Sequence, residues 1–365
     1  LSGSSDTNVN VSVKWDGAPA IFAGTDPSDG QFFVAKKGIF NKNPKIYRTP
    51  EEVDADTSGD LATKLKLALK HLPDLNIKGV IQGDFLYSKS DLKTKKQKGV
   101  SYVVFHPNTI AYAVPDNTPL AKTIKRSKIG IVWHTKYTGT TLETMTASFG
   151  ENIADSLAAS TSVWSIDAEC TDQTGTATFT KQETKDLTAI LSSAGKVFQK
   201  IDAASLNGIS ADDELLMRMK TFLNTKVRKQ ERIINVKSAV NDMIDYFTDY
   251  YKIETDKRKS TKGKAAVDVR KQLVMKYFSS TNKKNLEAIL ELMNHIVDAK
   301  LMLIAKMNQA SSLSTFVQTD KGFKAVGEEG FVAIDKMGKN AVKLVDRMEF
   351  SYNNFSDKVI KGWQR

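Results

Sequence analysis

Cysteine is almost absent from this sequence, which has one, Cys170, among 365 residues. A single thiol cannot form an intramolecular disulfide or a cysteine-based zinc cluster, and such sparse use is typical of a reducing compartment. Uninterrupted apolar runs are missing too, since none approaches the roughly 18 to 20 residues that a membrane-spanning helix needs. We therefore expect a cytoplasmic protein that has no membrane segment.

Acidic residues are fewer than basic ones. The chain has 42 Asp and Glu against 53 Lys and Arg, which gives a net charge of +11 and a pI of about 9.3. This excess favours an anionic partner such as nucleic acid, because a protein that neutralises phosphates releases their bound counterions. The alternative is that the basic surface only promotes solubility. The composition says nothing of the oligomeric state.

The first 140 residues contain short β-branched and aromatic runs, separated by loops rich in turn residues. Such runs are typical of β-strands. A helix is predicted over residues 60–71, where leucines recur at helical spacing before Pro73. The predicted strands of this part are 9–13, 20–24, 32–35, 80–81, 102–105 and 129–133.

From Thr180 onward the pattern is helical. Thr180 and Glu183 have the spacing of a capping box, and they precede a periodic segment that ends near Phe198. Longer helices are predicted over residues 212–251 and 285–307, and a strand before them at 163–166.

The last 40 residues again have β character. They predict a hairpin of strands 330–334 and 341–345 joined by a turn at 336–340. A hairpin alone is only marginally stable, so we expect it to rejoin the N-terminal sheet. The expected architecture is α+β: residues 1–140 and 321–365 form one β-rich domain, and residues 141–320 form a mainly α-helical insertion.

Lys14 lies in the run Val13-Lys14-Trp15-Asp16-Gly17, directly after a predicted strand. A lysine amine is nucleophilic only when unprotonated, which desolvation or neighbouring cations favour. Gly17 would let a phosphate approach the backbone, and Asp16 is placed to orient the amine or a ribose. A strand followed by an Asp-Gly turn explains the four residues equally simply.

Further motifs, taken in order, resemble those of the covalent nucleotidyltransferase superfamily, which comprises ATP-dependent RNA and DNA ligases and mRNA-capping enzymes. The resemblance is closest to phage-type RNA-ligase-like proteins. The run Lys14 to Gly17 matches the first motif, Lys-x-Asp-Gly. Five later segments are each similar to a further element of the family. Val34-Ala35-Lys36-Lys37-Gly38 resembles the basic strand end, Gln82-Gly83-Asp84-Phe85 the third motif, and Tyr102-Val103-Val104-Phe105 the purine-stacking strand. Glu329-Gly330-Phe331-Val332 resembles the fourth motif, and Val342-Lys343-Leu344-Val345 the fifth.

This resemblance implies an antiparallel-sheet nucleotidyltransferase (ATP-grasp-like ligase) domain that works through a lysyl-AMP intermediate, with ATP and Mg²⁺. It implies catalytic roles for Lys14, Asp16 and Lys343, and it assigns Asp84 and Glu329 to the metal or to the ribose hydroxyls. Phe105 would stack on the base. The implied nucleotide-binding residues are Lys14, Trp15, Gly17, Lys36, Lys37, Asp84, Phe105, Glu329 and Lys343.

The implied reaction seals a 5′-phosphate to a 3′-hydroxyl end of RNA. The stretch from Lys343 to Arg365 is too short for the C-terminal OB domain of DNA ligases and capping enzymes, so we expect none. A phage origin would place the protein in the cytoplasm of a bacterial host. A DNA ligase, a GTP-dependent capping-type enzyme and an inactive nucleotide-binding relative are the alternatives. Pro19, where many members have Arg, and Asp84, in place of Glu, keep the last one open.

A rival for the fourth motif is the strand from Ile129 to Lys136, which lacks the glutamate, so Glu329 is preferred. We expect Trp133 to lie in the core. A structural hydrogen bond is the favoured role of His134, and a place beside the pocket is the alternative for His134 and Lys136.

Basic residues dominate between Tyr251 and Lys284, with few acidic residues among them. Such a stretch could bind a polynucleotide backbone, with the interleaved Tyr250, Tyr251, Tyr277 and Phe278 stacking on bases. A solvated loop between two helices is an equal alternative. The residues predicted to bind nucleic acid are Lys257, Arg258, Lys259, Lys262, Lys264, Arg270 and Lys271.

Overall fold

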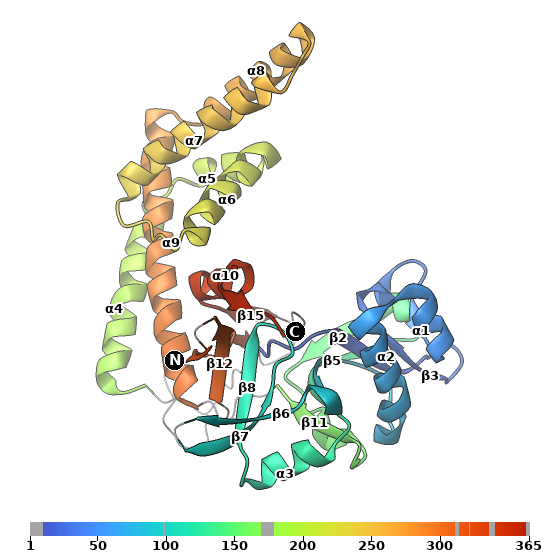
Figure 1. Cartoon of the computed structure of the whole chain (residues 1–365). Coiled ribbons are helices and arrows are strands. Elements are labelled where there is room, and N and C mark those ends of the chain that lie inside the picture. Colours follow the sequence, from blue (N-terminus) through green and yellow to red (C-terminus); the bar gives the residue numbers. More distant parts are fainter. Residues whose placement is uncertain are drawn as a thin grey trace. The chain divides into compact units, whose positions relative to one another are not determined.

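The computed structural model describes residues 10–97, 99–168, 179–310, 314–320, 322–335 and 340–362 (Figure 1). The described chain is of the α+β class, with largely antiparallel sheets and ten α-helices. It divides into two compact units. Unit 1 comprises Leu1–Thr178, Ile304–Asp346 and Asn353–Arg365, and unit 2 comprises Phe179–Leu303 and Arg347–Tyr352.

The largest sheet of unit 1 has the order β10-β9-β5-β2-β3-β4, with β11 beside β9. Only the β11–β9 pair is parallel among these pairings. Residues 141–168, expected in the helical insertion, instead supply β10 and β11 to this sheet. Its strands are β2 (Ala20–Thr25), β3 (Phe32–Ala35), β4 (Ile46–Tyr47), β5 (Val80–Ser88), β9 (Ile129–Thr138), β10 (Thr146–Phe149) and β11 (Val163–Asp167).

A three-stranded sheet joins the two ends of the chain, in the order β1-β14-β15. Its strands are β1 (Asn10–Val13), β14 (Phe331–Ile334) and β15 (Ala341–Leu344). Val13 is paired with Phe331, and Val332 with Lys343. The C-terminal hairpin therefore pairs with the N-terminal strand, as predicted, while residues 336–339 of its turn lie outside the described residues.

A third sheet has the order β13-β12-β8-β7-β6, with β16 beside β12. Its strands are β6 (Lys93–Gln97), β7 (Val100–Phe105), β8 (Ile110–Pro115), β12 (Ser314–Thr319), β13 (Gly322–Ala325) and β16 (Val359–Ile360). Strand β12 pairs antiparallel with β8, with Ser314 opposite Ala113 and Val317 opposite Ile110. This pairing places another C-terminal strand against the N-terminal part of the chain.

Three helices complete the N-terminal part of unit 1: α1 (Pro50–Asp56), α2 (Gly59–His71) and α3 (Pro119–Arg126). Helix α2 follows its predicted bounds within one residue. Leu65 and Ala68 of α2 are fully buried in one core with Ile21 and Trp133 of the largest sheet. Because a buried leucine side chain contributes about 1.5–3 kcal/mol, this apolar face fixes the helix on the sheet.

Unit 2 is helical. Its helices are α4 (Lys181–Phe198), α5 (Ala203–Ser210), α6 (Asp213–Arg228), α7 (Val236–Asp256), α8 (Thr261–Met275), most of α9 (Ser280–Met307) and the start of α10 (Arg347–Phe355). The Thr180–Glu183 capping box is present. The single helix predicted over residues 212–251 is wrong: the chain leaves α6 after Arg228, and Gln230 adopts a φ of 59° that interrupts the helix.

Candidate active site

Lys14 and Glu329 meet at the end of the three-stranded sheet, although they are 315 positions apart. The backbone N–H of Lys14 donates to the carbonyl of Gly330 at 2.8 Å, which extends the β1–β14 ladder by one residue. The Nζ of Lys14 donates to the carboxylate of Glu329. Because the Glu329 side chain is 7% exposed and the Lys14 side chain 27%, a buried carboxylate orients an amine that solvent can reach.

Gly17 places the segment after Lys14 directly against β5. A Cβ atom at position 17 would lie 2.5 Å from Cβ of Asp84 and 3.2 Å from the carbonyl oxygen of Phe85. Real Cβ atoms do not approach other atoms this closely, so only glycine fits without a shift. The absence of a side chain at Gly17 therefore brings Asp84 close to the Lys14 segment.

Asp16 connects this segment to the loop before β8. Its buried carboxylate accepts hydrogen bonds from Asn108 Nδ2, Thr109 N and Ile110 N, each at 2.6 Å. Its own N–H donates to the hydroxyl of Tyr112 at 2.7 Å. Burial raises the pKa of the Asp16 carboxyl, and the three donors oppose that rise. Both carboxylate oxygens are thus used within the protein, and Asp16 holds the Lys14 segment in place.

A pocket of about 480 Å³ opens beside Lys14. This volume is within the range of about 300–1,000 Å³ of small-molecule sites. Lys343 of β15 and Lys37, which follows β3, line it with Lys14, and Asp84 and His134 line it from β5 and β9. The pocket therefore combines three cationic side chains with at least one carboxylate, a composition suited to a phosphate-bearing ligand with a cation.

Two carboxyl groups of the site, those of Asp84 and Glu329, lie where burial disfavours their charged form. Burial, against the effect of Lys14 and with the nearby Glu329 and Asp16, raises the pKa of Asp84 to about 7. Burial, together with the nearby Asp16, also raises the pKa of Glu329 to about 7. A cation would relieve this repulsion, and Mg²⁺ is often held by one or two carboxylates together with substrate phosphates.

Asp84 and Glu329 therefore fit a Mg²⁺ ion that arrives with a phosphate ligand. They do not amount to a self-sufficient metal centre. Over the residues that the structure describes, no three or more His, Cys, Asp or Glu side chains are grouped so as to hold a metal ion.

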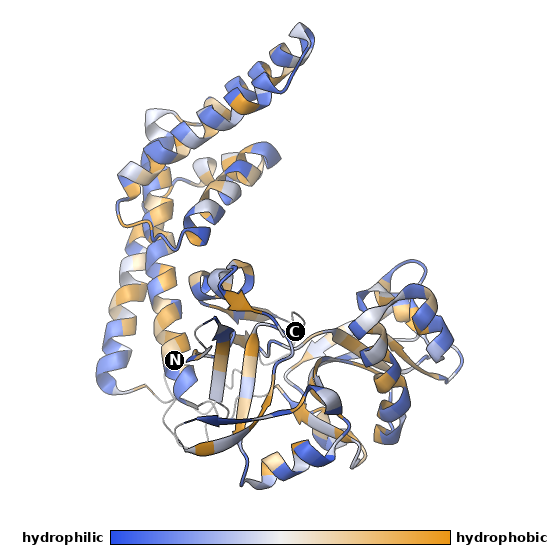
Figure 2. Cartoon of the chain, viewed as in Figure 1, coloured by the Kyte–Doolittle hydropathy of each residue, from blue (hydrophilic) through white to orange (hydrophobic). Residues whose placement is uncertain are grey.

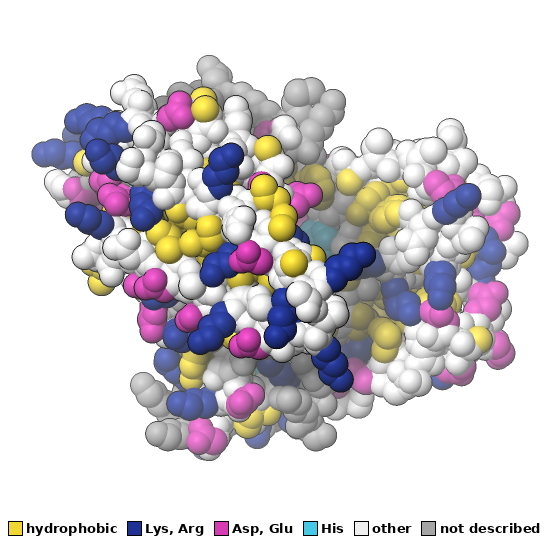
Figure 3. Space-filling model, turned by 90° about the horizontal axis from the view of Figure 1, so that it is seen from above, with side chains coloured by type: hydrophobic (Ala, Val, Ile, Leu, Met, Phe, Trp, Pro, Cys, Tyr) yellow, Lys and Arg dark blue, Asp and Glu magenta, His cyan; other side chains and the backbone are white. Residues whose placement is uncertain are grey.

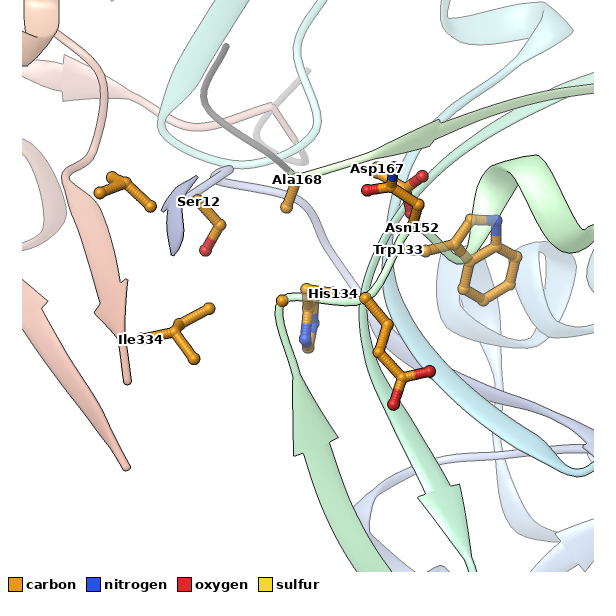
Figure 4. Close-up of a pocket in the computed structure, with 10 residues that line it drawn as sticks. Ser12, Trp133, His134, Asn152, Asp167, Ala168 and Ile334 are labelled. Carbon is orange, nitrogen blue, oxygen red and sulfur yellow. The ribbon is translucent and has the colours of Figure 1, made fainter. Parts of the chain in front are cut away.

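His134 of β9 lines the pocket. Its Nε2 is 3.9 Å from Oδ2 of Asp84, and its Nδ1 is 2.7 Å from Oγ1 of Thr135. Burial, with Lys343 and Lys14, lowers the pKa of His134 to about 4, so the ring is neutral at neutral pH. A neighbouring cavity of about 20 Å³, room for one water molecule, has His134 between Ser12 and Ile334 on one side and Trp133 on the other (Figure 4).

A family model described as "Family of unknown function (DUF6267)" matches residues 1–359. The chain belongs to this family. No curated protein and no solved structure matches the chain. Among the described helices of this family member, none is long and apolar enough to cross a membrane.

Most of the predicted site residues of this family member come together. Lys14, Trp15, Lys37, Asp84 and Lys343 all line the pocket. Beside them, Gly17 packs on Asp84 and Glu329 contacts Lys14.

Two of the nucleotide-binding predictions are corrected by the structure. Phe105 does not offer a ring face to a ligand, because it is fully buried and stacks on Tyr112 at 5.4 Å in the core. Lys36 is not at the pocket either: its Nζ pairs with Asp56 at 2.9 Å, and Asp56 also binds Lys45. The backbone explains the second error, because β3 ends at Ala35 and Lys37 already begins a 3₁₀-helix (Lys37–Phe40), so the two lysines do not form one basic strand end.

Other outcomes concern β9. Trp133 is fully buried, as predicted. His134 has its predicted hydrogen bond and lines the pocket as well. Lys136 pairs instead with Glu151 at 3.1 Å.

Two aromatic pocket residues were missed from the sequence. Tyr137 of β9 donates from its hydroxyl to Oε1 of Gln82 at 2.7 Å, and Phe149 of β10 lines the same pocket. The spacing of Tyr137 from Thr135 along one strand face could have indicated the tyrosine. No motif indicates Phe149, because its place depends on the pairing of β10 with β9.

Proposed function

We propose that this chain is a covalent nucleotidyltransferase of the polynucleotide-ligase type, with the ATP-grasp-like fold of that superfamily, and that Lys14 carries AMP. The observation that supports this best is the contact between Lys14 and Glu329 beside a pocket of about 480 Å³ lined by Lys37 and Lys343. An isolated lysine after a strand would need neither a buried carboxylate nor two further cations. Together they form a place for a nucleophile and a triphosphate.

In the first step, the lone pair of Lys14 Nζ attacks the α-phosphorus of ATP. A P–N bond forms, the bond from the α-phosphorus to the bridging oxygen breaks, and pyrophosphate leaves with the electron pair. The amine must first lose a proton to the solvent, which reaches the 27% exposed Lys14 side chain, and the contacting carboxylate of Glu329 orients the amine.

The other residues act on charge and position. Lys37 and Lys343 offset the negative charge of the phosphates and of the leaving pyrophosphate. Asp84 and Glu329 would hold Mg²⁺, which when bound would screen the same phosphates. Trp15, Tyr137 and Phe149 are the aromatic side chains that line the pocket, and they replace Phe105 as candidates to contact the base.

In the later steps, an oxygen of the 5′-phosphate of RNA attacks the phosphorus of the lysyl-AMP, a P–O bond forms, and the P–N bond breaks with Lys14 leaving as the amine. A 3′-hydroxyl oxygen then attacks that phosphate, the phosphodiester bond forms and AMP leaves. These steps rest on the resemblance of the motifs, and the pocket residues support the first step only.

Incubation of the full chain with ATP labelled at the α-phosphate, with Mg²⁺, tests the proposal. We expect a covalent label that survives denaturation, is released by acid as a phosphoramidate is, and is absent from Lys14→Ala. Lys122→Ala is the matched control, because Lys122 is an exposed lysine of α3 outside the pocket. A label on Lys14→Ala, or none on the wild type, would contradict the proposal.

Labelling by GTP instead of ATP would favour a capping-type enzyme. With ATP, competition among nicked RNA, single-stranded RNA and nicked DNA as acceptors separates an RNA ligase from a DNA ligase. Noncovalent ATP binding with no label in any condition would identify an inactive nucleotide-binding relative.

A further inference from the structure

The segment after α7 is an ordered helical hairpin in unit 2, not the solvated loop that its composition allowed. Helix α8 begins at Thr261, where Oγ of Ser260 accepts a hydrogen bond from the N–H of Gly263 at 3.1 Å. Val267 and Val274, seven positions apart on one helix face, are buried in the core of unit 2. One side of α8 is therefore fixed against the unit, and the rest of its circumference faces solvent.

Exposed cations surround this free part of α8. Lys257 and Arg258, which precede the helix, pair with Glu254 at 2.7 and 3.4 Å respectively. Six more cations have no carboxylate within ion-pair distance in the part of the chain that the structure describes. These six are Lys259, Lys262, Lys264, Arg270, Lys271 and Lys276, of which Lys271 is half-buried and the other five are exposed. Figure 2 colours α8 largely hydrophilic.

The surface seen in Figure 3 carries both basic and acidic side chains. Around α8 only Asp268 interrupts the positive charge between Lys259 and Lys276, and it accepts a hydrogen bond from Gln272 at 2.9 Å. A local excess of unpaired cations on a fixed helix is a surface for a polyanion.

The aromatic residues of this region are not available to stack on bases, which corrects the expectation from the sequence. Tyr251 is 1% exposed and donates to Glu214 at 3.1 Å. Arg218 covers the ring of Tyr250 at 4.0 Å. The Tyr277 hydroxyl donates to the carbonyl of Ser205 at 3.2 Å, and Phe278 packs edge-on against Phe247 in the core of unit 2. Contact with a polynucleotide is therefore left to the cations.

We propose that the exposed surface of α8 binds the phosphodiester backbone of a polynucleotide through charge alone, with no preference for base sequence. Lys262 and Lys276 are separated by about 21 Å at 1.5 Å per residue, which corresponds to about six phosphates of one strand of a duplex. The inference rests on the proposed function, in that it gives the ligase its hold on the polymer. The partly exposed Val269 and Leu273 are too few to form the apolar face of a membrane-binding helix.

The test measures binding of the full chain to fluorescent oligonucleotides of about 20 uridines or thymidines by anisotropy over a series of salt concentrations. For single strands the slope of log K against log salt is about −0.7 per phosphate neutralised. The triple variant Lys264→Gln, Arg270→Gln, Lys271→Gln should lose about 2 units of slope, hence about 100-fold in affinity at 0.1 M salt. The matched control is Lys70→Gln, Lys78→Gln, Lys122→Gln, three exposed lysines of unit 1.

The inference fails if the control variant loses as much slope as the α8 variant, or if neither loses any. It also fails if adenosine, cytidine and uridine oligomers differ more than tenfold in affinity, because charge alone does not read bases. If the α8 variant lost binding to phosphatidylserine vesicles but kept its binding to oligonucleotides, the surface would be assigned to a membrane and the inference would be overturned.

Self-labelling by ATP, measured on the same variants, separates this inference from the proposed function. The α8 variant should label Lys14 at the wild-type rate. If the wild type takes no label but the α8 variant loses oligonucleotide affinity, the proposed function falls and the binding surface stands. If labelling is normal and oligonucleotide affinity is unchanged, only the binding surface falls.

Discussion

Replacing Asp16 tests whether the loop before β8 holds the Lys14 segment in place. Asp16→Ala removes the acceptor of two backbone N–H groups and of the Asn108 amide. Each buried donor left without a partner costs about 1–3 kcal/mol. Allowing for water that enters the space, we expect the free energy of unfolding to fall by about 3–6 kcal/mol.

Asp16→Asn is the sharper comparison. The new side chain keeps one oxygen for Thr109 N and Ile110 N, and its amide would face Nδ2 of Asn108. Oδ1 of Asn108 is buried and has no hydrogen-bond partner within the described structure. A half-turn of the Asn108 amide would therefore restore the third bond. We expect Asp16→Asn to cost no more than about 1–2 kcal/mol, since its hydrogen bonds are kept.

Urea unfolding followed by tryptophan fluorescence measures both variants, and Trp15 reports on the site because its ring lies 4.8 Å from that of Tyr112. Self-labelling should follow the same order, with the wild type above Asp16→Asn and Asp16→Ala lowest. The reasoning is refuted if Asp16→Ala unfolds within about 1 kcal/mol of the wild type, or if the asparagine variant is the less stable of the two.

The remaining predictions concern the pocket. Because burial raises the pKa of Asp84 and of Glu329 to about 7, the folded protein binds more protons than the unfolded chain between about pH 4 and 7, and stability should fall as pH rises through this window. Asp84→Asn should flatten this dependence in unfolding curves recorded at several pH values; an unchanged slope would contradict the assignment. Gly17→Ala should lower the free energy of unfolding by about 1–3 kcal/mol, and a wild-type melting curve would show that the contact with Asp84 is looser than inferred. Lys343→Met should slow self-labelling by about 10²-fold, while Lys36→Met, outside the pocket, should leave it near the wild-type rate; equal effects would refute the difference in position.

Local patterns predict the elements of this fold well where one face is buried. The alternation before Lys14, the capping box at Thr180 and the leucine spacing of α2 each specify an element, and each is present. The patterns fail where a local break competes with periodicity. Apolar spacing runs from α6 into α7, but the turn at Gln230 separates them, because one residue of positive φ ends a helix whatever the periodicity around it.

What the sequence by itself determined about the site is the nucleophile candidate and its neighbours along the chain, because Lys14, Asp16 and Gly17 are linked by three peptide bonds. What only the tertiary structure decided is which distant groups face them. Strand pairing of β1 with β14 brings Glu329 to the amine, and packing takes Phe105 into the core, away from the pocket. The same packing shows that Asp16 holds a loop and that the aromatic residues near α8 pack against the core of unit 2. Side-chain type and spacing specify chemistry and local shape, whereas burial and pairing depend on the whole chain, and these determine which group is free to react.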